Sequence, residues 1–450
     1  MNISNFPKLV LPDGNPIAFF KVAGMWQEEY QLLPERIKQM YEWDETTHSY
    51  KLPNEEWLRW RDHGPFYYDQ SNPNYVSHAL GGSDISTLFD GSVLSKKLTR
   101  YENQHGNDFK CVLELFHQKL GIEPEIAEEK NEDILQIGHI YEESVAQVFV
   151  MLYKKHHKSA NVVMWNDQRM FRCGQKNPDG TLKYPFALAD LDRLIKINGR
   201  TGVLEIKTTR YNSEVAQLFR KGICPLKYEL QVRYYLAITN LPFAYICCSW
   251  GLDPNECAYV YIERDLALEK DIMALAAEFI RCLEEKKEPD WTGQNTTLVY
   301  KYLRRINGIL DESKSSVEIS SDKKYDALAL YQIAQDTEDR ETEQKEDDEQ
   351  AQKILAGLLP YIGKATTATI QLNESQKIEI RLQSPDKRRA IDENRLLAEE
   401  PKIYNAYCND FNTALFKKEQ PVLYEKYKKQ PVLSDSKALN YKISIKDIKK

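Results

Sequence analysis

Hydrophobic and polar positions alternate most clearly between residues 186 and 207. The apolar positions from Ala189 to Ile197 predict one β-strand, although two aspartates interrupt them. Asn198-Gly199 predicts a tight turn, and Val203 to Lys207 predicts the returning strand. The pattern therefore predicts a β-hairpin.

Acidic and basic side chains occupy defined faces of this hairpin. Because successive side chains of a strand point to opposite faces, Glu205 and Lys207 are expected on one face and Ile206 on the other. Asp190 and Asp192 share a face of the first strand, so either can meet Glu205. Two adjacent carboxylates can hold a hard divalent cation, and a nearby ammonium can orient water or stabilise charge on a phosphate. The pattern fits a nuclease metal site, but also an ordinary cross-strand ion pair.

The surrounding sequence alternates between helical and strand periodicities. Between residues 76 and 290 this alternation predicts a mixed α/β core, with a central sheet flanked by helices. The expected helices are Ile134–Lys155, Tyr228–Thr239 and Asp265–Glu285, and the further strands are Ala244–Trp250 and Ala258–Arg264.

The chain divides into three predicted regions. Residues 1–75 form an N-terminal extension rich in aromatic residues and prolines, and residues 76–290 form the core. Residues 291–450 form a mainly helical region, with one long helix from Tyr325 to about Leu359 as half of a helical hairpin or coiled coil. A short β-hairpin at 368–382 and a basic helical tail complete this region.

Composition limits the class of protein. The 450 residues carry a net charge of -7, much of it in the acidic run Asp336–Glu349, so any DNA contact must come from local basic patches. No apolar run is long enough for a membrane span and no signal peptide is recognised, so a cytoplasmic protein is expected. The 8 cysteines include no C-x-x-C pair, which predicts buried free thiols.

Five segments resemble the YqaJ-type viral recombinase family, the phage recombination exonucleases with the PD-(D/E)xK nuclease fold of lambda-type exonuclease and restriction endonucleases. The resemblance covers roughly residues 57 to 290. In chain order the segments are Gly81–Ile85; Glu114-Leu115-Phe116 with Lys119-Leu120-Gly121; Gly138–Glu142; Ala189–Asp192 with Glu205–Lys207; and Gln231–Leu236. The resemblance implies a restriction-endonuclease-like core.

The resemblance also implies roles for individual residues. Asp192 matches the metal-binding aspartate, because an alignment on Asp192 fits the family's motif better than one on Asp190. Glu205 matches the second carboxylate ligand. The carbonyl of Ile206 and the carboxylate of Glu142 complete the implied metal site. Lys207 matches the catalytic lysine.

Three further residues match positions that meet DNA in similar enzymes. Gln231 matches the glutamine of a Q-x-x-x-Y helix near the scissile phosphate. Ser83 is a candidate contact to the DNA end, or a simple N-cap. Arg61 matches the arginine of a Trp-Leu-x-x-Arg helix. Here an insertion separates that helix from the Gly81-Gly82 pair, which departs from the family's pattern.

The activity implied is hydrolysis of linear duplex DNA from its ends, 5′→3′, with Mg²⁺ or Mn²⁺. Similar enzymes leave single strands for an annealing protein, and some assemble into rings, so an annealing partner and a homo-oligomer are expected. A RecB-type nuclease is one alternative, although the C-x-x-C of its iron-sulfur site is missing. A non-catalytic DNA-binding or assembly protein on a nuclease scaffold is the other.

Overall fold

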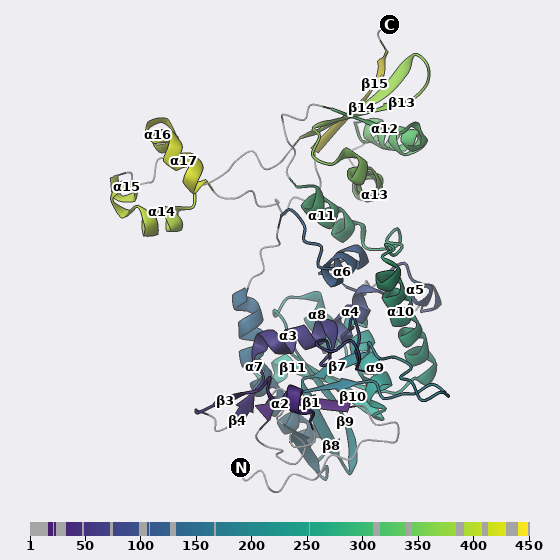
Figure 1. The fold of residues 1–450 in the computed structure, drawn as a ribbon, viewed down its shortest axis with the longest axis vertical. Coiled ribbons are helices and arrows are strands. Elements are labelled where there is room, and N and C mark those ends of the chain that lie inside the picture. Colours follow the sequence, from purple (N-terminus) through teal and green to yellow (C-terminus); the bar gives the residue numbers. More distant parts are fainter. Residues whose placement is uncertain are drawn as a thin grey trace. The chain divides into compact units, whose positions relative to one another are not determined.

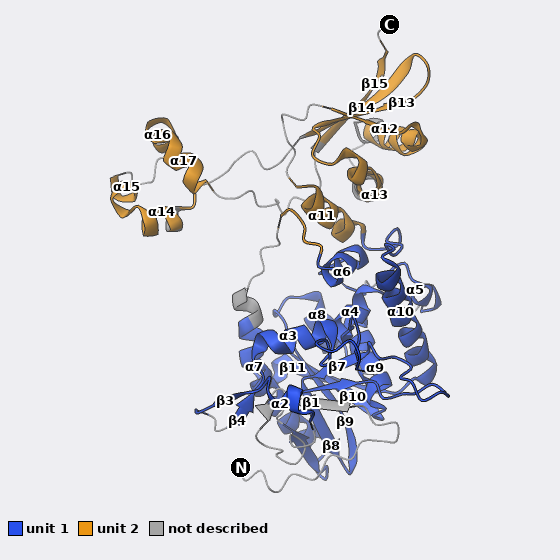
Figure 2. Cartoon of the chain, in the orientation of Figure 1, with its two compact units in different colours: residues 1–121, 131–295 blue, residues 122–130, 296–450 orange. Residues whose placement is uncertain are grey.

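The computed structural model describes most of the chain, and its contacts divide it into two compact units (Figure 2). Unit 1 comprises residues 1–121 and 131–295, and unit 2 comprises residues 122–130 and 296–450. In the described residues no helix has the length and apolar character to cross a bilayer. The described residues are 17–20, 22–23, 33–46, 49–72, 75–98, 106–107, 109–126, 132–165, 168–251, 253–308, 316–338, 344–383, 391–406, 413–428 and 440–448.

A five-stranded mixed sheet forms the centre of unit 1 (Figure 1). Its order is β11-β10-β9-β8-β5, and only β9 and β10 run parallel. The strands are β5 (Val162–Trp165), β8 (Arg193–Ile197), β9 (Arg200–Thr208), β10 (Phe243–Ser249) and β11 (Cys257–Glu263). The predicted hairpin is confirmed, because β8 and β9 pair across Asn198 (φ 49°) and Gly199 (φ 85°), which tolerate the left-handed backbone of this turn.

Helix α7 (Glu132–His156) covers one face of this sheet. Its buried Val145 and Phe149 belong to a cluster with Ile195 of β8 and Ile206 of β9. The predicted helix at 134–155 is confirmed.

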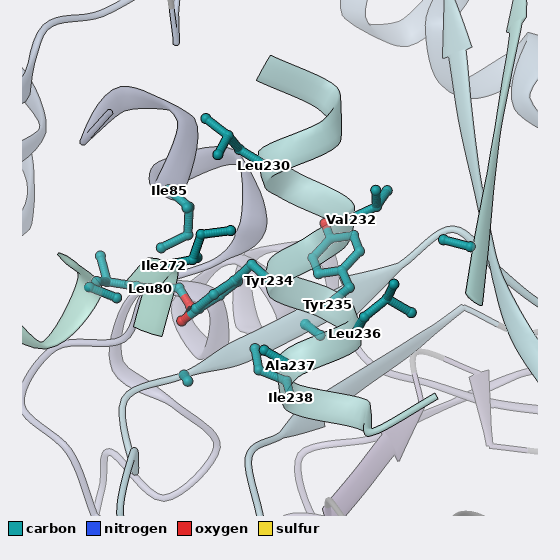
Figure 3. Close-up of a cluster of buried hydrophobic side chains, with 14 of the residues drawn as sticks. Leu80, Ile85, Leu230, Val232, Tyr234, Tyr235, Leu236, Ala237, Ile238 and Ile272 are labelled. Atoms are coloured by element: carbon teal, nitrogen blue, oxygen red, sulfur yellow. Dashed lines mark hydrogen bonds between the residues drawn. The ribbon is translucent and has the colours of Figure 1, made fainter. Parts of the chain in front are cut away.

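Helix α9 (Leu226–Thr239) covers the other face and is buried over almost its whole length. Leu80, Ile85 and Ile272 gather beside Tyr234 of this helix (Figure 3). The Tyr234 hydroxyl donates a hydrogen bond to the Leu80 carbonyl at 3.1 Å. Because Ile272 comes from α10 (Leu266–Glu285), α9 is held between the sheet and a second helix, as the predicted mixed α/β class requires.

A second, three-stranded sheet corrects the prediction of one strand from Ala189 to Ile197. The sheet is formed by β1 (Ile17–Phe20), β6 (Arg169–Arg172) and β7 (Leu188–Leu191), whereas β8 belongs to the five-stranded sheet. The apolar pattern is continuous because both strands are buried, but the chain changes sheets at Asp192.

The remaining elements of unit 1 are short. The predicted helical fragment around Trp57 is confirmed as α3, whose Trp57 and Trp60 are buried with Met170 and Leu188. The helices are α2 (Glu35–Lys38), α3 (Asn54–His63), α4 (Gly82–Thr87), α5 (Val93–Lys97), α6 (Val112–Lys119) and α8 (Glu214–Arg220), and a small sheet contains β2 (Val22–Ala23), β3 (Glu42–Asp44) and β4 (Ser49–Lys51).

Unit 2 contains a four-stranded sheet of order β12-β13-β14-β15. The predicted short hairpin is confirmed as β13 (Thr367–Gln371) and β14 (Gln376–Gln383). Two strands beside it, β12 (Val317–Ile319) and β15 (Asn440–Asp447), were missed, and the second corrects the prediction that the basic tail is helical throughout.

The long helix predicted from Tyr325 to Leu359 is also wrong. Unit 2 instead has α12 (Lys324–Glu338) and α13 (Gln344–Ile362), which contact each other. Residues 336–349 include no apolar side chain, so the sequence gives a single long helix nothing to bury between its two apolar parts. Residues 339–343 lie outside the described part. The other helices of this unit are α11 (Thr296–Asn307), α14 (Glu393–Glu399), α15 (Pro401–Ala406), α16 (Thr413–Glu419) and α17 (Pro421–Tyr427).

We expect Gly202→Val to destabilise unit 1, because a Cβ at Gly202 would lie 2.3 Å from the Phe243 ring on the neighbouring strand. The expected loss in the free energy of unfolding is roughly 1–3 kcal/mol. Since all 7 tryptophans precede residue 296, tryptophan fluorescence during denaturant unfolding reports on this unit. Gly138→Ala is the control, because its Cβ would meet only Thr208 Oγ1 at 3.7 Å. Equal midpoints for both variants would contradict the expectation.

Candidate active site

Asp192 lies where the ladder between β8 and β9 ends. The last register pair is Arg193 with Leu204. Beyond it, the Ile206 amide donates a hydrogen bond of 2.7 Å to Asp192 Oδ2. The side chain of Asp192 therefore continues the pairing of β9 after the backbone of β8 has turned away, and this bond fixes its carboxylate beside the strand.

Glu205 and Lys207 share the opposite face of β9 from Ile206, as predicted. Lys207 Nζ donates to Glu205 Oε1 at 2.6 Å, and Gln231 Nε2 from α9 donates to the same oxygen at 2.6 Å. The Gln231 amide also donates to the Tyr235 hydroxyl at 2.8 Å. Lys207 Nζ lies 5.1 Å from the centre of the Tyr228 ring, a cation-π distance. Gln231 and Tyr228 of α9 thus orient Glu205 and Lys207 of β9.

The charges around Glu205 are unbalanced. The pKa of Glu205 is raised to about 8, mainly by burial and next by the nearby Asp192, against the lowering effect of Lys207. Burial acts to lower the pKa of Lys207, but the Glu205 and Asp192 carboxylates outweigh it and raise that pKa. Glu205 Oε2 is buried and has no hydrogen-bond partner among the described residues. Asp192 and Glu205 therefore have an excess of negative charge that a further cation could balance.

Glu142 approaches the same site from α7. Its carboxyl pKa is raised by burial and by Asp192, which places it within electrostatic reach of the pair. Arg193 Nη1 donates to Glu142 Oε1 at 2.7 Å, and Arg193 Nη2 donates to Glu143 Oε2 at 2.9 Å. Arg193 Nη1 also donates to the Asp192 carbonyl at 2.5 Å. One largely buried guanidinium thus connects α7 to the start of β8.

Asp190, the alternative ligand, is held by other groups. Trp57 Nε1 donates to Asp190 Oδ2 at 3.3 Å, and Gln168 Nε2 donates to Asp190 Oδ1 at 3.2 Å. Arg61 Nε lies 3.7 Å from Asp190 Oδ2. The structure therefore brings Arg61 and Asp190 together beside α3, while Asp192 is the aspartate that contacts β9 next to Glu205.

Ser83 is exposed on the short helix α4, and the prediction that it caps this helix is wrong. The N-cap is Gly81, whose amide donates to Asp84 Oδ2 at 3.1 Å. The helix lies close against α9, because a Cβ at Gly82 would meet the side chains of Tyr235 and Gln231 at 2.4 and 2.8 Å. Glycine at this position allows that approach.

Sequence reasoning missed the roles of Arg193 and Lys119. Lys119 Nζ is buried, donates to Asp62 Oδ1 at 2.7 Å and lies 3.3 Å from Asp84 Oδ2, so it connects α6 to α3 and α4. The sequence signal for this role was the place of Lys119 in the matched segment Lys119-Leu120-Gly121. Arg193 directly follows Asp192, but its carboxylate partners are 50 and 51 residues away, so the sequence held no local signal for its role.

The carboxylates of this site are the groups that could hold a divalent cation. Among the described side chains, no three of His, Cys, Asp or Glu are arranged as a complete metal cluster. Magnesium, however, binds through one or two protein carboxylates together with water and substrate phosphate. Asp192 and Glu205, with the unpartnered Glu205 Oε2, fit that requirement.

Residues 56–242 match the family model of the YqaJ-like viral recombinase domain, which confirms the resemblance inferred from the motifs. Every predicted site residue, from Arg61 to Gln231, lies within this match. No match to the sequence was found among curated proteins.

Three solved structures show a distant likeness. An alkaline exonuclease from Laribacter hongkongensis (LHK-Exo) is 17% identical, with 46% of this chain and 89% of that chain covered and a TM-score of 0.30. The complex of LHK-Exo with dAMP gives the same identity and coverage and a TM-score of 0.32. SSO0001 is 19% identical over 44% of this chain and 74% of that chain, with a TM-score of 0.21.

We expect Glu205→Gln to become more stable relative to wild type as the pH rises, in the presence of chelator. The folded state holds the pKa of Glu205 at about 8, above its ordinary value of 4.5, so ionisation is easier in the unfolded chain. The free energy of unfolding therefore falls between these two pKa values, by on the order of a few kcal/mol, and glutamine removes this loss. Denaturant unfolding at about pH 5 and about pH 8.5 measures it. A difference between the proteins that is the same at both pH values would refute the assignment.

Proposed function

We propose that this chain, whose residues 56–242 carry a YqaJ-like viral recombinase domain, is a metal-dependent DNA exonuclease of phage-type recombination. Its substrate is linear duplex DNA, which it degrades 5′→3′ to expose single strands for an annealing partner. The observation that carries the proposal is the convergence of Asp192, Glu205, Lys207 and Gln231 at one end of the β8–β9 hairpin. The five-stranded sheet between α7 and α9 serves as a PD-(D/E)xK core.

Asp192 and Glu205 would hold Mg²⁺ or Mn²⁺. Glu142 would add a carboxylate from α7, and the Ile206 carbonyl would add a backbone oxygen. When bound, the cation supplies Lewis-acid activation of a water molecule and of the scissile phosphate. The raised pKa of Glu205 supports this assignment, because positive charge is the missing partner of two carboxylates that share a buried site.

Lys207 stabilises the negative charge that develops on the phosphate during hydrolysis. Its ammonium is positioned before substrate arrives, by Glu205 at 2.6 Å and by the Tyr228 ring. Gln231 holds the same Glu205 oxygen at 2.6 Å, so it keeps the carboxylate in place for both the lysine and the cation. Ser83 and Arg61 contact the DNA end or backbone near this site. Some similar enzymes assemble into rings, so the proposal includes a homo-oligomer.

A non-catalytic DNA-binding protein on the same scaffold is the second candidate. The four groups that converge here argue against it, because an acid-base pair oriented by a buried glutamine serves no evident purpose in a passive scaffold. A RecB-type nuclease with an iron-sulfur cluster lacks support, because the sequence has no C-x-x-C and six of the described cysteines are buried.

The decisive test is degradation of linear duplex DNA labelled separately at each 5′ and 3′ end, with Mg²⁺ and with chelator. We expect metal-dependent loss of the 5′ label and a fall in rate of about 10²–10³-fold or more in Lys207→Ala, since one charge-stabilising group is removed. Lys196→Ala is the matched control, because Lys196 lies on the same hairpin near its turn. Binding of DNA without degradation by wild type would favour the non-catalytic protein, and loss of the 3′ label would reverse the polarity.

Metal binding is tested without DNA. We expect Mg²⁺ or Mn²⁺ to raise the midpoint of thermal unfolding, followed by tryptophan fluorescence, because the cation binds only the folded site. Asp192→Asn and Glu205→Gln should remove this increase. Asp190→Asn should keep it, because Asp190 is engaged by Trp57 and Gln168 instead. If Asp190→Asn alone removed the increase, the ligand would be Asp190.

A further inference from the structure

The four-stranded sheet of unit 2 has one apolar face and one polar face. On β14, Ile378, Ile380 and Leu382 are buried, and α12 contacts β13, β14 and β15 (Figure 1). Since side chains alternate along a strand, Lys377 and Arg381 point to the opposite face from these apolar residues. This second face, the polar face, consists at its described positions of Glu318, Thr367, Thr369, Gln371, Lys377, Glu379, Arg381, Lys442, Ser444 and Lys446.

Cations on the polar face stand directly opposite one another. The register pairs Lys377 with Lys446 and Arg381 with Lys442 across β14 and β15. Like charges directly opposite each other destabilise a sheet. The two pairs are four positions apart along β14, which corresponds to about 14 Å at roughly 3.4 Å per residue. The sheet thus presents four cations on one face, in two pairs along the strands.

The carboxylates of the polar face do not balance these cations. Glu379 Oε1 accepts from both Lys446 Nζ at 2.6 Å and Arg381 Nε at 2.7 Å, and the hydrogen bond from Lys446 lowers the pKa of Glu379. Lys377 and Lys442 form no ion pair with a described residue. The other carboxylate, Glu318, lies on β12, two strands away from β14. The excess positive charge remains available to an anion.

We propose that the polar face binds the phosphate backbone of double-stranded DNA. A duplex carries one negative charge per about 1.7 Å of its axis, so several phosphates can meet both cation pairs at once. Binding of single strands generally uses aromatic side chains on which bases stack, and the described positions of this face include none. The choice of DNA rests on the function proposed above, but the face lies outside the matched residues 56–242.

Contacts of this kind would be independent of base sequence and sensitive to salt. Lysine, arginine, serine and threonine side chains bind phosphate oxygens without reading base edges. The polar face would therefore increase the affinity of the whole chain for duplex DNA without taking part in hydrolysis. Its loss should raise the DNA concentration needed for half-maximal cleavage and leave the rate at saturating DNA unchanged.

The test uses the full-length chain and a fluorescently labelled blunt duplex, in chelator so that no cleavage occurs. Fluorescence anisotropy gives the binding constant at several salt concentrations. For Lys377→Ala/Lys442→Ala we expect weaker binding and a logarithmic salt dependence that is shallower by about 0.9 for each lost phosphate contact. The matched control is Lys402→Ala/Lys418→Ala, which removes the same charge from exposed positions of α15 and α16.

A second variant should act in the opposite direction. Glu379→Gln removes the carboxylate shared by Arg381 and Lys446, so we expect tighter binding and a steeper salt dependence. An unchanged salt dependence in Lys377→Ala/Lys442→Ala, or weaker binding by Glu379→Gln, overturns the proposal. An equal effect on a single strand of the same length overturns the assignment to duplex DNA.

The same proteins separate this proposal from the nuclease proposal. Cleavage is measured independently, with Mg²⁺ and end-labelled duplex. If the protein cleaves DNA but the salt dependence of its DNA binding is the same in wild type and in Lys377→Ala/Lys442→Ala, only the role of the polar face is refuted. A chain that never cleaves DNA, but whose binding responds to these lysines, refutes only the nuclease and supports the polar face.

Discussion

The hydrogen bond from the Ile206 amide to the Asp192 carboxylate is the interaction on which the site depends. It forms where β8 stops pairing with β9, because Asp192 directly precedes Arg193 and Ile206 follows Leu204 by two residues. A buried amide without a partner costs free energy, so the side chain that satisfies it is held firmly. The bond therefore lets the chain leave one sheet for another and also fixes a carboxylate beside Glu205.

A second constraint is the charge of the buried site. Glu205 is almost fully buried next to Asp192, with Lys207 as its ion-pair partner. Arg193 pairs with Glu142 and Glu143 on α7, so it neutralises the outer carboxylates and not the inner pair. Removing one partner of a buried ion pair is costly, because it leaves an uncompensated buried charge. Among the described residues, Lys207 is therefore the cation that faces the buried Glu205.

Local chemistry in the sequence was enough to predict the β8–β9 hairpin and its faces. Asn198-Gly199 permits the left-handed turn, and the alternation placed Glu205 beside Lys207 and away from Ile206. The same alternation left Asp190 and Asp192 equivalent, because a buried strand that changes sheets looks continuous in sequence. Only tertiary contacts distinguish Asp190 from Asp192, because the hydrogen-bond partners of Asp190 are distant in the chain. The role of Arg193 was missed for the same reason.

The C-terminal region shows how register creates chemistry that composition hides. The segment Tyr441 to Lys446 alternates polar and apolar residues as a half-buried strand does, but its lysines were read as part of a solvated helical tail. Once this segment pairs with β14, Lys442 and Lys446 stand opposite Arg381 and Lys377. Residues more than 60 positions apart then form one cationic surface in a chain of net charge -7. Total charge is therefore a poor guide to what this protein can bind, because a binding surface depends on which residues the sheet brings together.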